Sequence, residues 1–125
     1  MRELRPKRLS PGTAILTLPY AITQVKAIVH VVGPRVRGTQ PNEVQRQQLA
    51  SCYIRALDMA KRYRCKSVAL PCISTGISGF PRGEAAVIAV LTFRAWLEDN
   101  SSAGISVIFC VISADDLILY HNLLN

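Results

Sequence analysis

Short apolar runs alternate with longer segments of helical periodicity along most of this chain. The runs are almost continuously apolar, which is typical of strands buried on both faces of a sheet. Strands that alternate with helices favour a layered α/β fold whose sheet is at least partly parallel. The expected strands are 13–17, 27–33, 67–74 and 105–113, and the expected helices are 43–64, 83–97 and 115–124.

The two longer helical segments repeat apolar residues at three- and four-residue spacing, as an amphipathic helix does. Asn42 directly precedes the first segment and fits the N-cap position. The expected inner face of the first helix is Leu49, Cys52, Tyr53, Ala56, Leu57 and Ala60, and that of the second is Ala85, Ile88, Ala89, Thr92, Phe93, Trp96 and Leu97.

The size and hydrophobicity of the chain predict one globular domain over residues 1–125. With 125 residues, half of them hydrophobic, the chain is long enough to bury a core and too apolar to be disordered. No apolar run approaches the roughly 18–20 residues of a membrane span. The first residues are basic but lack the apolar stretch of a signal peptide. We therefore expect an intracellular protein without a membrane partner.

The four cysteines are scattered, without a CxxC pair and without histidines at metal-ligand spacing. Most lie within apolar patterns, so we expect buried thiols in a reducing compartment, with no metal and no cofactor.

The net charge is +7, from 15 basic and 8 acidic residues. Much of the excess belongs to residues 1–10, a basic N-terminal segment. Such a charge suits an anionic small ligand or a nucleic acid. No stripe of interleaved aromatic and basic residues supports nucleic acid, which leaves it as the less favoured partner.

The stretch PCISTGISGFPRG, residues 71–83, joins an expected strand to an expected helix. Ligands of α/β sheets gather at the carboxyl ends of strands, which is where this stretch lies. Its two glycines can adopt positive φ and expose backbone N–H groups that form a nest for phosphate, next to the positive end of a helix. Pro81 fits the first turn of that helix. A tight connection without a ligand is the alternative, since neither a P-loop nor a GxGxxG motif is present.

The wider segment 67–100 resembles the second half of a macro domain, the ADP-ribose-binding fold, and is most similar to the MacroD-type branch. The similarity runs from about Pro11 to Leu124 and includes the motif STGISGFP. It implies a three-layer α/β/α sandwich with a mixed sheet, in which the loop cradles the diphosphate and Phe80 lies against the terminal ribose. The implied ligand-binding residues are Ser74, Thr75, Gly76, Ile77, Ser78, Gly79, Phe80 and Ile112.

Two of these positions depart from the family pattern. Ser78 stands where an aromatic residue is usual, and Ile112 stands where this branch tends to have a phenylalanine against the adenine. Because a base–aromatic stack contributes about 1–3 kcal/mol in single-strand nucleic-acid proteins, we expect the affinity to be lower by about tenfold or more.

The family's first strands and helix, with their Asn-containing segment and glycine run, have no match here. The resemblance therefore implies an N-terminally truncated, partial macro domain with one face of its sheet short of cover. Either a partner supplies the missing layer, or a second copy does, or the chain is a fragment of a longer product. The catalytic residues remain unknown. We expect His30 to be a core residue, Asp115 and Asp116 to cap the last helix, Glu84 to be solvated, and His121 to have at most a helix-dipole role.

Three hypotheses follow for function. The first is binding of ADP-ribose or of mono-ADP-ribosylated protein. The second is a de-ADP-ribosylating hydrolase completed by a missing N-terminal part or another chain, related to O-acetyl-ADP-ribose deacetylases. The third is a degenerate, non-catalytic module that contacts protein or nucleic acid through its basic segment.

Overall fold

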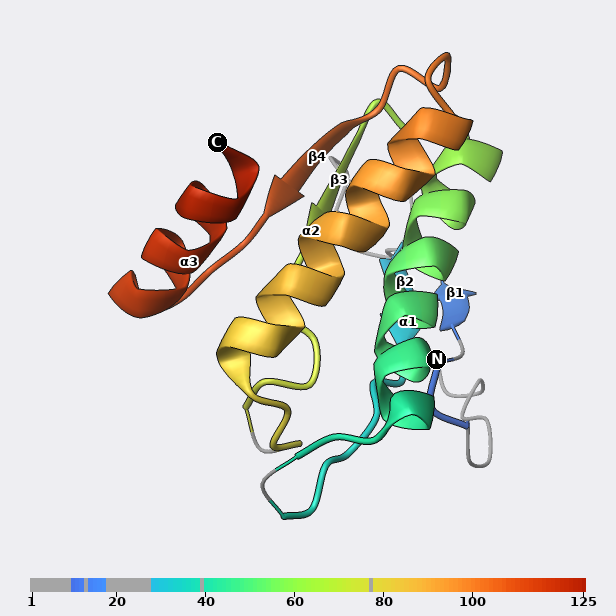
Figure 1. Cartoon of the computed structure of the whole chain (residues 1–125). Helices are drawn as coiled ribbons and strands as arrows, with labels where there is room; N and C mark the ends of the chain where they lie inside the picture. Colours follow the sequence, from blue (N-terminus) through green and yellow to red (C-terminus); the bar gives the residue numbers. More distant parts are fainter. Residues whose placement is uncertain (1–9, 13, 18–27, 39, 77) are drawn as a thin grey trace.

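The computed structural model of the chain describes residues 10–12, 14–17, 28–38, 40–76 and 78–125. Strands and helices alternate through most of this part, as expected (Figure 1). Among the described residues the strands form two separate two-stranded sheets, one antiparallel and one parallel, so parallel pairing is present as predicted but not within a single mixed sheet. The elements are β1 (Ala14–Thr17), β2 (Ile28–Val31), α1 (Glu43–Arg62), β3 (Ser67–Leu70), α2 (Arg82–Asp99), β4 (Ser106–Phe109) and α3 (Ala114–Leu124).

The strands are shorter than the apolar runs that predict them. β3 ends at Leu70, whereas the apolar run continues to 74. Pro71 follows directly, and a proline has no N–H for the sheet ladder. β4 likewise ends at Phe109 within the run 105–113. The segment after each strand is therefore free to form loops at the same edge of the sheet.

Helix α1 begins and packs as its sequence predicts. Asn42 accepts a hydrogen bond from the Gln45 backbone at 2.8 Å, and the Gln45 side chain accepts one from the Asn42 backbone at 2.8 Å. This reciprocal pair is a capping box, which satisfies two backbone donors at the start of the helix. The buried face consists of the predicted residues, Leu49, Cys52, Tyr53, Ala56, Leu57 and Ala60.

Asn42→Ala is expected to lower the free energy of unfolding by about 1 kcal/mol, because it removes one half of the capping box. Urea denaturation followed by circular dichroism measures this change. Asn122→Ala, an exposed change in the last turn of α3, is the control and should have a smaller effect. Equal effects would show that the cap does not stabilise α1.

Helix α2 lies beside α1 and also contacts α3 (Figure 1). It packs against both helices, and its buried face includes Ala86 and Val90 in addition to the predicted Ala85, Ala89 and Trp96. The other predicted residues Ile88, Thr92 and Phe93 are only partly buried. Leu97, predicted to be inside, is 38% exposed. The indole Nε1 of Trp96 donates to Asp58 of α1 at 2.8 Å, which ties the two helices together.

The parallel pair β3–β4 presents its alternate residues to two sides. Leu70 is 3% exposed and packs in the core, whereas Ile108 on the opposite face is 54% exposed. The Cys110 backbone N–H donates to the Leu70 carbonyl at 2.8 Å just beyond the paired residues. Since the strands are parallel, the segments that follow them leave from one edge.

In the described part of the chain no helix is long and apolar enough to cross a membrane.

Candidate functional site

The loop after β3 closes on itself through its backbone. The Phe80 N–H donates to the Ser74 carbonyl at 2.8 Å, and the Gly79 N–H donates to the Gly76 carbonyl at 3.0 Å. Gly79 has φ +81°, as the sequence predicts for a turn glycine, but Gly76 is not among the residues with positive φ. Ser74 is the second residue of the loop in the left-handed region, with φ +65°. Few residues other than glycine adopt this conformation, so the surroundings must hold Ser74 there.

The segment that follows β2 is hydrogen-bonded to this loop. The Val36 N–H donates to the Ser78 carbonyl at 2.7 Å, and the Ser74 hydroxyl donates to the Pro34 carbonyl at 2.8 Å. A Cβ at Gly33 would lie 2.1 Å from the Ser74 Oγ, so only glycine fits that approach. The adjacent Gly33 and Pro34 are typical of a loop, but nothing in the local sequence indicates its contact to the glycine loop.

Several backbone donors of the loop remain unused. Within the described residues, the N–H groups of Thr75, Gly76 and Ser78 have no acceptor. A Cβ at Gly76 would meet nothing within 4 Å, so this part of the loop is open. Successive free N–H groups in a turn form an anion-binding concavity. The loop therefore offers the donors that a phosphate group requires.

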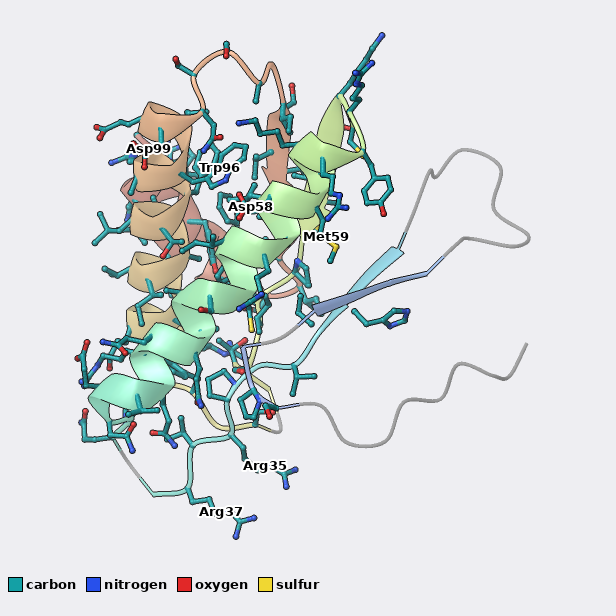
Figure 2. All side chains as sticks on the ribbon, turned by 90° about the vertical axis from the view of Figure 1, so that its right-hand side faces the viewer. Arg35, Arg37, Asp58, Met59, Trp96 and Asp99 are labelled. Carbon is teal, nitrogen blue, oxygen red and sulfur yellow. The ribbon has the colours of Figure 1, made fainter. Side chains whose placement is uncertain are left out.

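The N-terminus of α2 adds to this positive character. Pro81 is its N-cap, rather than a first-turn residue as predicted, and makes no side-chain capping hydrogen bond. The first N–H groups of the helix are thus not capped by that side chain, and they carry the positive end of the helix dipole. Arg35 and Arg37 belong to the segment that contacts the loop. They flank the buried Val36 and project into solvent (Figure 2). The surroundings of the loop favour an anion.

Phe80 does not have the predicted place. Its side chain is 1% exposed and belongs to the hydrophobic core, so it has no free face for a ribose. Packing explains this, because a large aromatic ring at the start of α2 gains more by burial than it would by lying on the surface. Ile112, in contrast, is 102% exposed beyond β4, at the edge where the loop lies. Ile77 lies outside the described residues.

The hydroxyl groups of the loop are partly occupied by internal contacts. Ser74 donates to Pro34, and the Thr75 Oγ1 donates to the Cys72 carbonyl at 3.3 Å. Both bonds fix loop geometry and leave the backbone N–H groups as the principal donors. Ser78 is half-buried beside them, with its carbonyl held by Val36.

Charged side chains close to the start of α2 are paired. Glu84, expected to be solvated, forms an ion pair with Arg46 of α1. Arg82 donates to the Ser113 hydroxyl at 3.3 Å and lies 4.0 Å from Asp116. These pairs connect α2 to α1 and to α3. They position the helix end on which the loop closes.

The remaining candidates for chemistry lie on β2 and on α3. His30 is exposed on β2, contrary to the expectation of a core histidine, and His121 lies in the last turn of α3. Asp115 and Asp116 are in the first turn of α3, but Ser113 is its N-cap. No group of three or more His, Cys, Asp or Glu side chains that could hold a metal ion occurs among the residues described.

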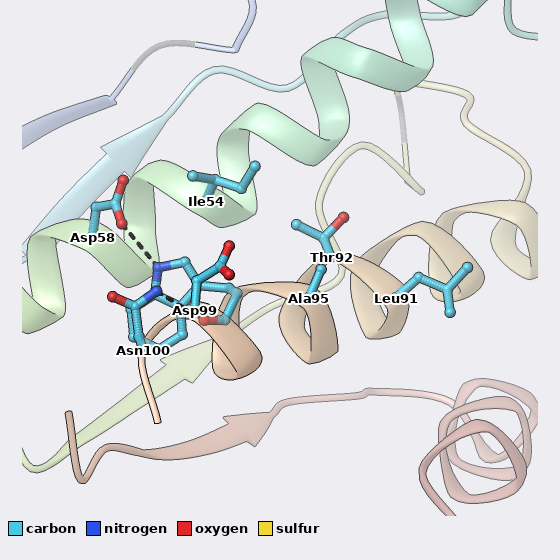
Figure 3. Close-up of a pocket in the computed structure, with 8 residues that line it drawn as sticks. Ile54, Asp58, Leu91, Thr92, Ala95, Asp99 and Asn100 are labelled. Carbon is cyan, nitrogen blue, oxygen red and sulfur yellow. Dashed lines mark hydrogen bonds between the residues drawn. The ribbon is translucent and has the colours of Figure 1, made fainter. Parts of the chain in front are cut away.

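A separate hollow of about 520 Å³ lies between the outer faces of α1 and α2 (Figure 3). Two carboxylates line it, those of Asp58 and Asp99, and Asp58 is held by Trp96. Carboxylates repel a diphosphate, and no run of free backbone N–H groups is available on a regular helix surface. The glycine loop is therefore a better candidate for an anion site than this hollow.

The comparisons with known proteins agree with this fold. The family model described as "Macro domain" matches residues 1–89. A structure of the Oceanobacillus iheyensis macrodomain with ADP superposes with a TM-score of 0.84 at 34% identity, covering 94% of this chain and 60% of that one. The Trypanosoma brucei macrodomain in complex with ADP-ribose gives a TM-score of 0.79 at 26% identity, covering 93% and 47%. The predicted α/β sandwich is thus confirmed.

Curated relatives are similar over nearly all of this chain. The ADP-ribose glycohydrolase MACROD1 of Rattus norvegicus is 40% identical over 110 residues, which are 88% of this chain and 42% of that protein. The protein-ADP-ribose hydrolase of Staphylococcus aureus (strain COL) is 38% identical over 114 residues, 91% of this chain and 42% of that protein. This chain therefore spans less than half the length of these relatives.

Proposed function

Because the chain belongs to the macro domain family, we propose that it binds ADP-ribose, free or attached to a protein, and that the loop from Ser74 to Gly79 holds the diphosphate. The observation that carries the proposal is the set of free N–H groups at Thr75, Gly76 and Ser78, beside an open surface at Gly76. The relatives' names and the ligands in the similar structures support the choice of ADP-ribose among anions.

The diphosphate is bound mainly by backbone donors in this account. Hydrogen bonds from N–H groups to an anion are charge-assisted and stronger than neutral ones. The N-terminus of α2 supplies further favourable potential, and Arg35 and Arg37 raise the local concentration of anionic ligands. Ile112, exposed at the same edge, is the residue we assign to the adenine. An isoleucine offers apolar contact without aromatic stacking, so phosphate contacts outweigh adenine contacts.

The buried Phe80 stabilises the conformation of the loop. Its backbone N–H closes the loop on Ser74, and its ring is fixed in the core. The free cysteines at all four positions suit a reducing compartment, so we place this function inside the cell. Hydrolysis is not part of the proposal.

ADP-ribose is expected to raise the melting temperature of the purified chain, and AMP is expected to raise it less. A ligand at about 100 times its dissociation constant adds roughly 2.7 kcal/mol to stability. Differential scanning fluorimetry with millimolar ligand measures the shift. A cooperative melt that ADP-ribose leaves unchanged would refute the proposal. A salt-sensitive shift with RNA or DNA in its place would favour the interaction-module hypothesis.

A further inference from the structure

A buried tyrosine hydroxyl lies at the entry of the glycine loop. Tyr53 of α1 is 0% exposed, and its hydroxyl donates to the Pro71 carbonyl at 3.2 Å. The same oxygen accepts a hydrogen bond from the Ile73 N–H at 3.2 Å. The two backbone groups flank Cys72, where the chain leaves β3 and turns into the loop. One side chain from a distant part of the sequence thus fixes both.

The sheet cannot supply these two hydrogen bonds. β3 ends at Leu70, and Pro71 has no N–H with which to continue the ladder. The Pro71 carbonyl and the Ile73 N–H would otherwise be polar groups at the border of the core. An unsatisfied buried backbone group costs about 1–3 kcal/mol. The hydroxyl of Tyr53 therefore replaces ladder partners that end with the strand, which a phenylalanine of equal size would not do.

A second buried tyrosine lies beside this hydroxyl. Tyr120 of α3 is 4% exposed, and its hydroxyl is close enough to Tyr53 and to Cys72 to influence the pKa of both groups. Burial raises the pKa of Tyr53 to about 12, although the hydrogen bond from Ile73 opposes the shift. Burial also raises the pKa of Tyr120. Both hydroxyls are hence protonated at neutral pH, as that of Tyr53 must be to donate to the Pro71 carbonyl.

We propose that Tyr53 is a positioning residue for the phosphate-binding loop, an inference that rests on the proposed function. Ile73 directly precedes Ser74, which has the left-handed φ of +65° and starts the loop. Ile73 is itself 7% exposed, so its backbone direction is set by the core on one side and by Tyr53 on the other. Loss of the hydroxyl allows this peptide unit to rotate, and the donors at Thr75 and Gly76 then lose their common direction.

Tyr53→Phe is the test variant, and Tyr63→Phe at the end of α1, where the ring is 46% exposed, is the matched control. Three quantities are measured for each: the amide hydrogen-exchange rate of Ile73, the affinity for ADP-ribose, and the affinity for AMP. For Tyr53→Phe we expect Ile73 exchange to rise at least about tenfold and ADP-ribose affinity to fall about tenfold, which is the scale of one hydrogen bond. AMP affinity should change less than about twofold, because AMP lacks the second phosphate.

The outcomes separate this inference from the proposed function. A wild-type chain that does not bind ADP-ribose overturns the proposed function and the positioning role with it. A wild-type chain that binds, with equal losses of ADP-ribose and AMP affinity in Tyr53→Phe, overturns the positioning role alone. Unchanged protection of Ile73 does the same. If Tyr53→Phe fails to fold, Tyr120→Phe removes only the neighbouring hydroxyl and is expected to give the same pattern with smaller changes.

Discussion

Gly76→Glu is expected to reduce the affinity for ADP-ribose at least about 100-fold and to leave the melting temperature of the free protein nearly unchanged. The fold tolerates the side chain because a Cβ at Gly76 meets no atom within 4 Å and the residue does not have positive φ. The ligand does not tolerate it, since a carboxylate would stand beside the diphosphate and close the open part of the loop. Isothermal titration calorimetry gives the affinity, and differential scanning fluorimetry the stability.

Two controls separate steric and charge effects from the position itself. Gly76→Ala adds a Cβ without charge, so it should lower the affinity far less than glutamate. Ser101→Glu adds the same carboxylate to an exposed turn after α2, and its affinity should be close to that of the parent. A Gly76→Glu protein that binds as tightly as the parent would show that the diphosphate lies elsewhere.

Gly79→Ala is expected to lower the free energy of unfolding by about 3 kcal/mol, since two unfavourable terms add. The residue has φ +81°, which costs an alanine about 1 kcal/mol or more. Its Cβ would also lie 2.6 Å from the Val36 carbonyl oxygen, which is backbone and cannot turn aside. The contact between the segment after β2 and the glycine loop must therefore be lost. Chemical denaturation measures the change.

Gly104→Ala is the matched control for this variant. Gly104 also has positive φ, +66°, but its Cβ would meet nothing within 4 Å. It should cost only the conformational term, about 1 kcal/mol. The difference between the two variants then reports the clash with Val36. If both variants lose the same stability, the segment after β2 does not restrain the glycine loop in solution.

The helices and the place of the site could be predicted because they depend on local patterns. The buried face of α1 follows from apolar spacing alone, and Asn42 follows from capping chemistry. The loop at the carboxyl end of β3 follows from two glycines between a strand-like and a helix-like run. These signals are contained in a few consecutive residues, so they can be interpreted without knowledge of the tertiary structure.

The features that escaped prediction depend on contacts between distant segments. The left-handed φ of Ser74 requires the hydroxyl bond to Pro34, forty residues away in the chain. The sequence suggests that Phe80 contacts a ligand, but its ring is buried in the hydrophobic core. Glu84 looks solvated until Arg46 of another helix is placed beside it. Tertiary packing overrides the local pattern at each of these positions.

A titration of ¹⁵N-labelled protein with ADP-ribose, followed by amide NMR, tests the central claim most directly. We expect saturable shifts that are largest at the N–H groups of Thr75, Gly76 and Ser78, with smaller shifts at the start of α2. AMP should reproduce only part of this pattern. Saturable shifts centred on the hollow at Asp58 and Asp99, with the loop amides unmoved, would contradict the claim that the glycine loop binds the diphosphate.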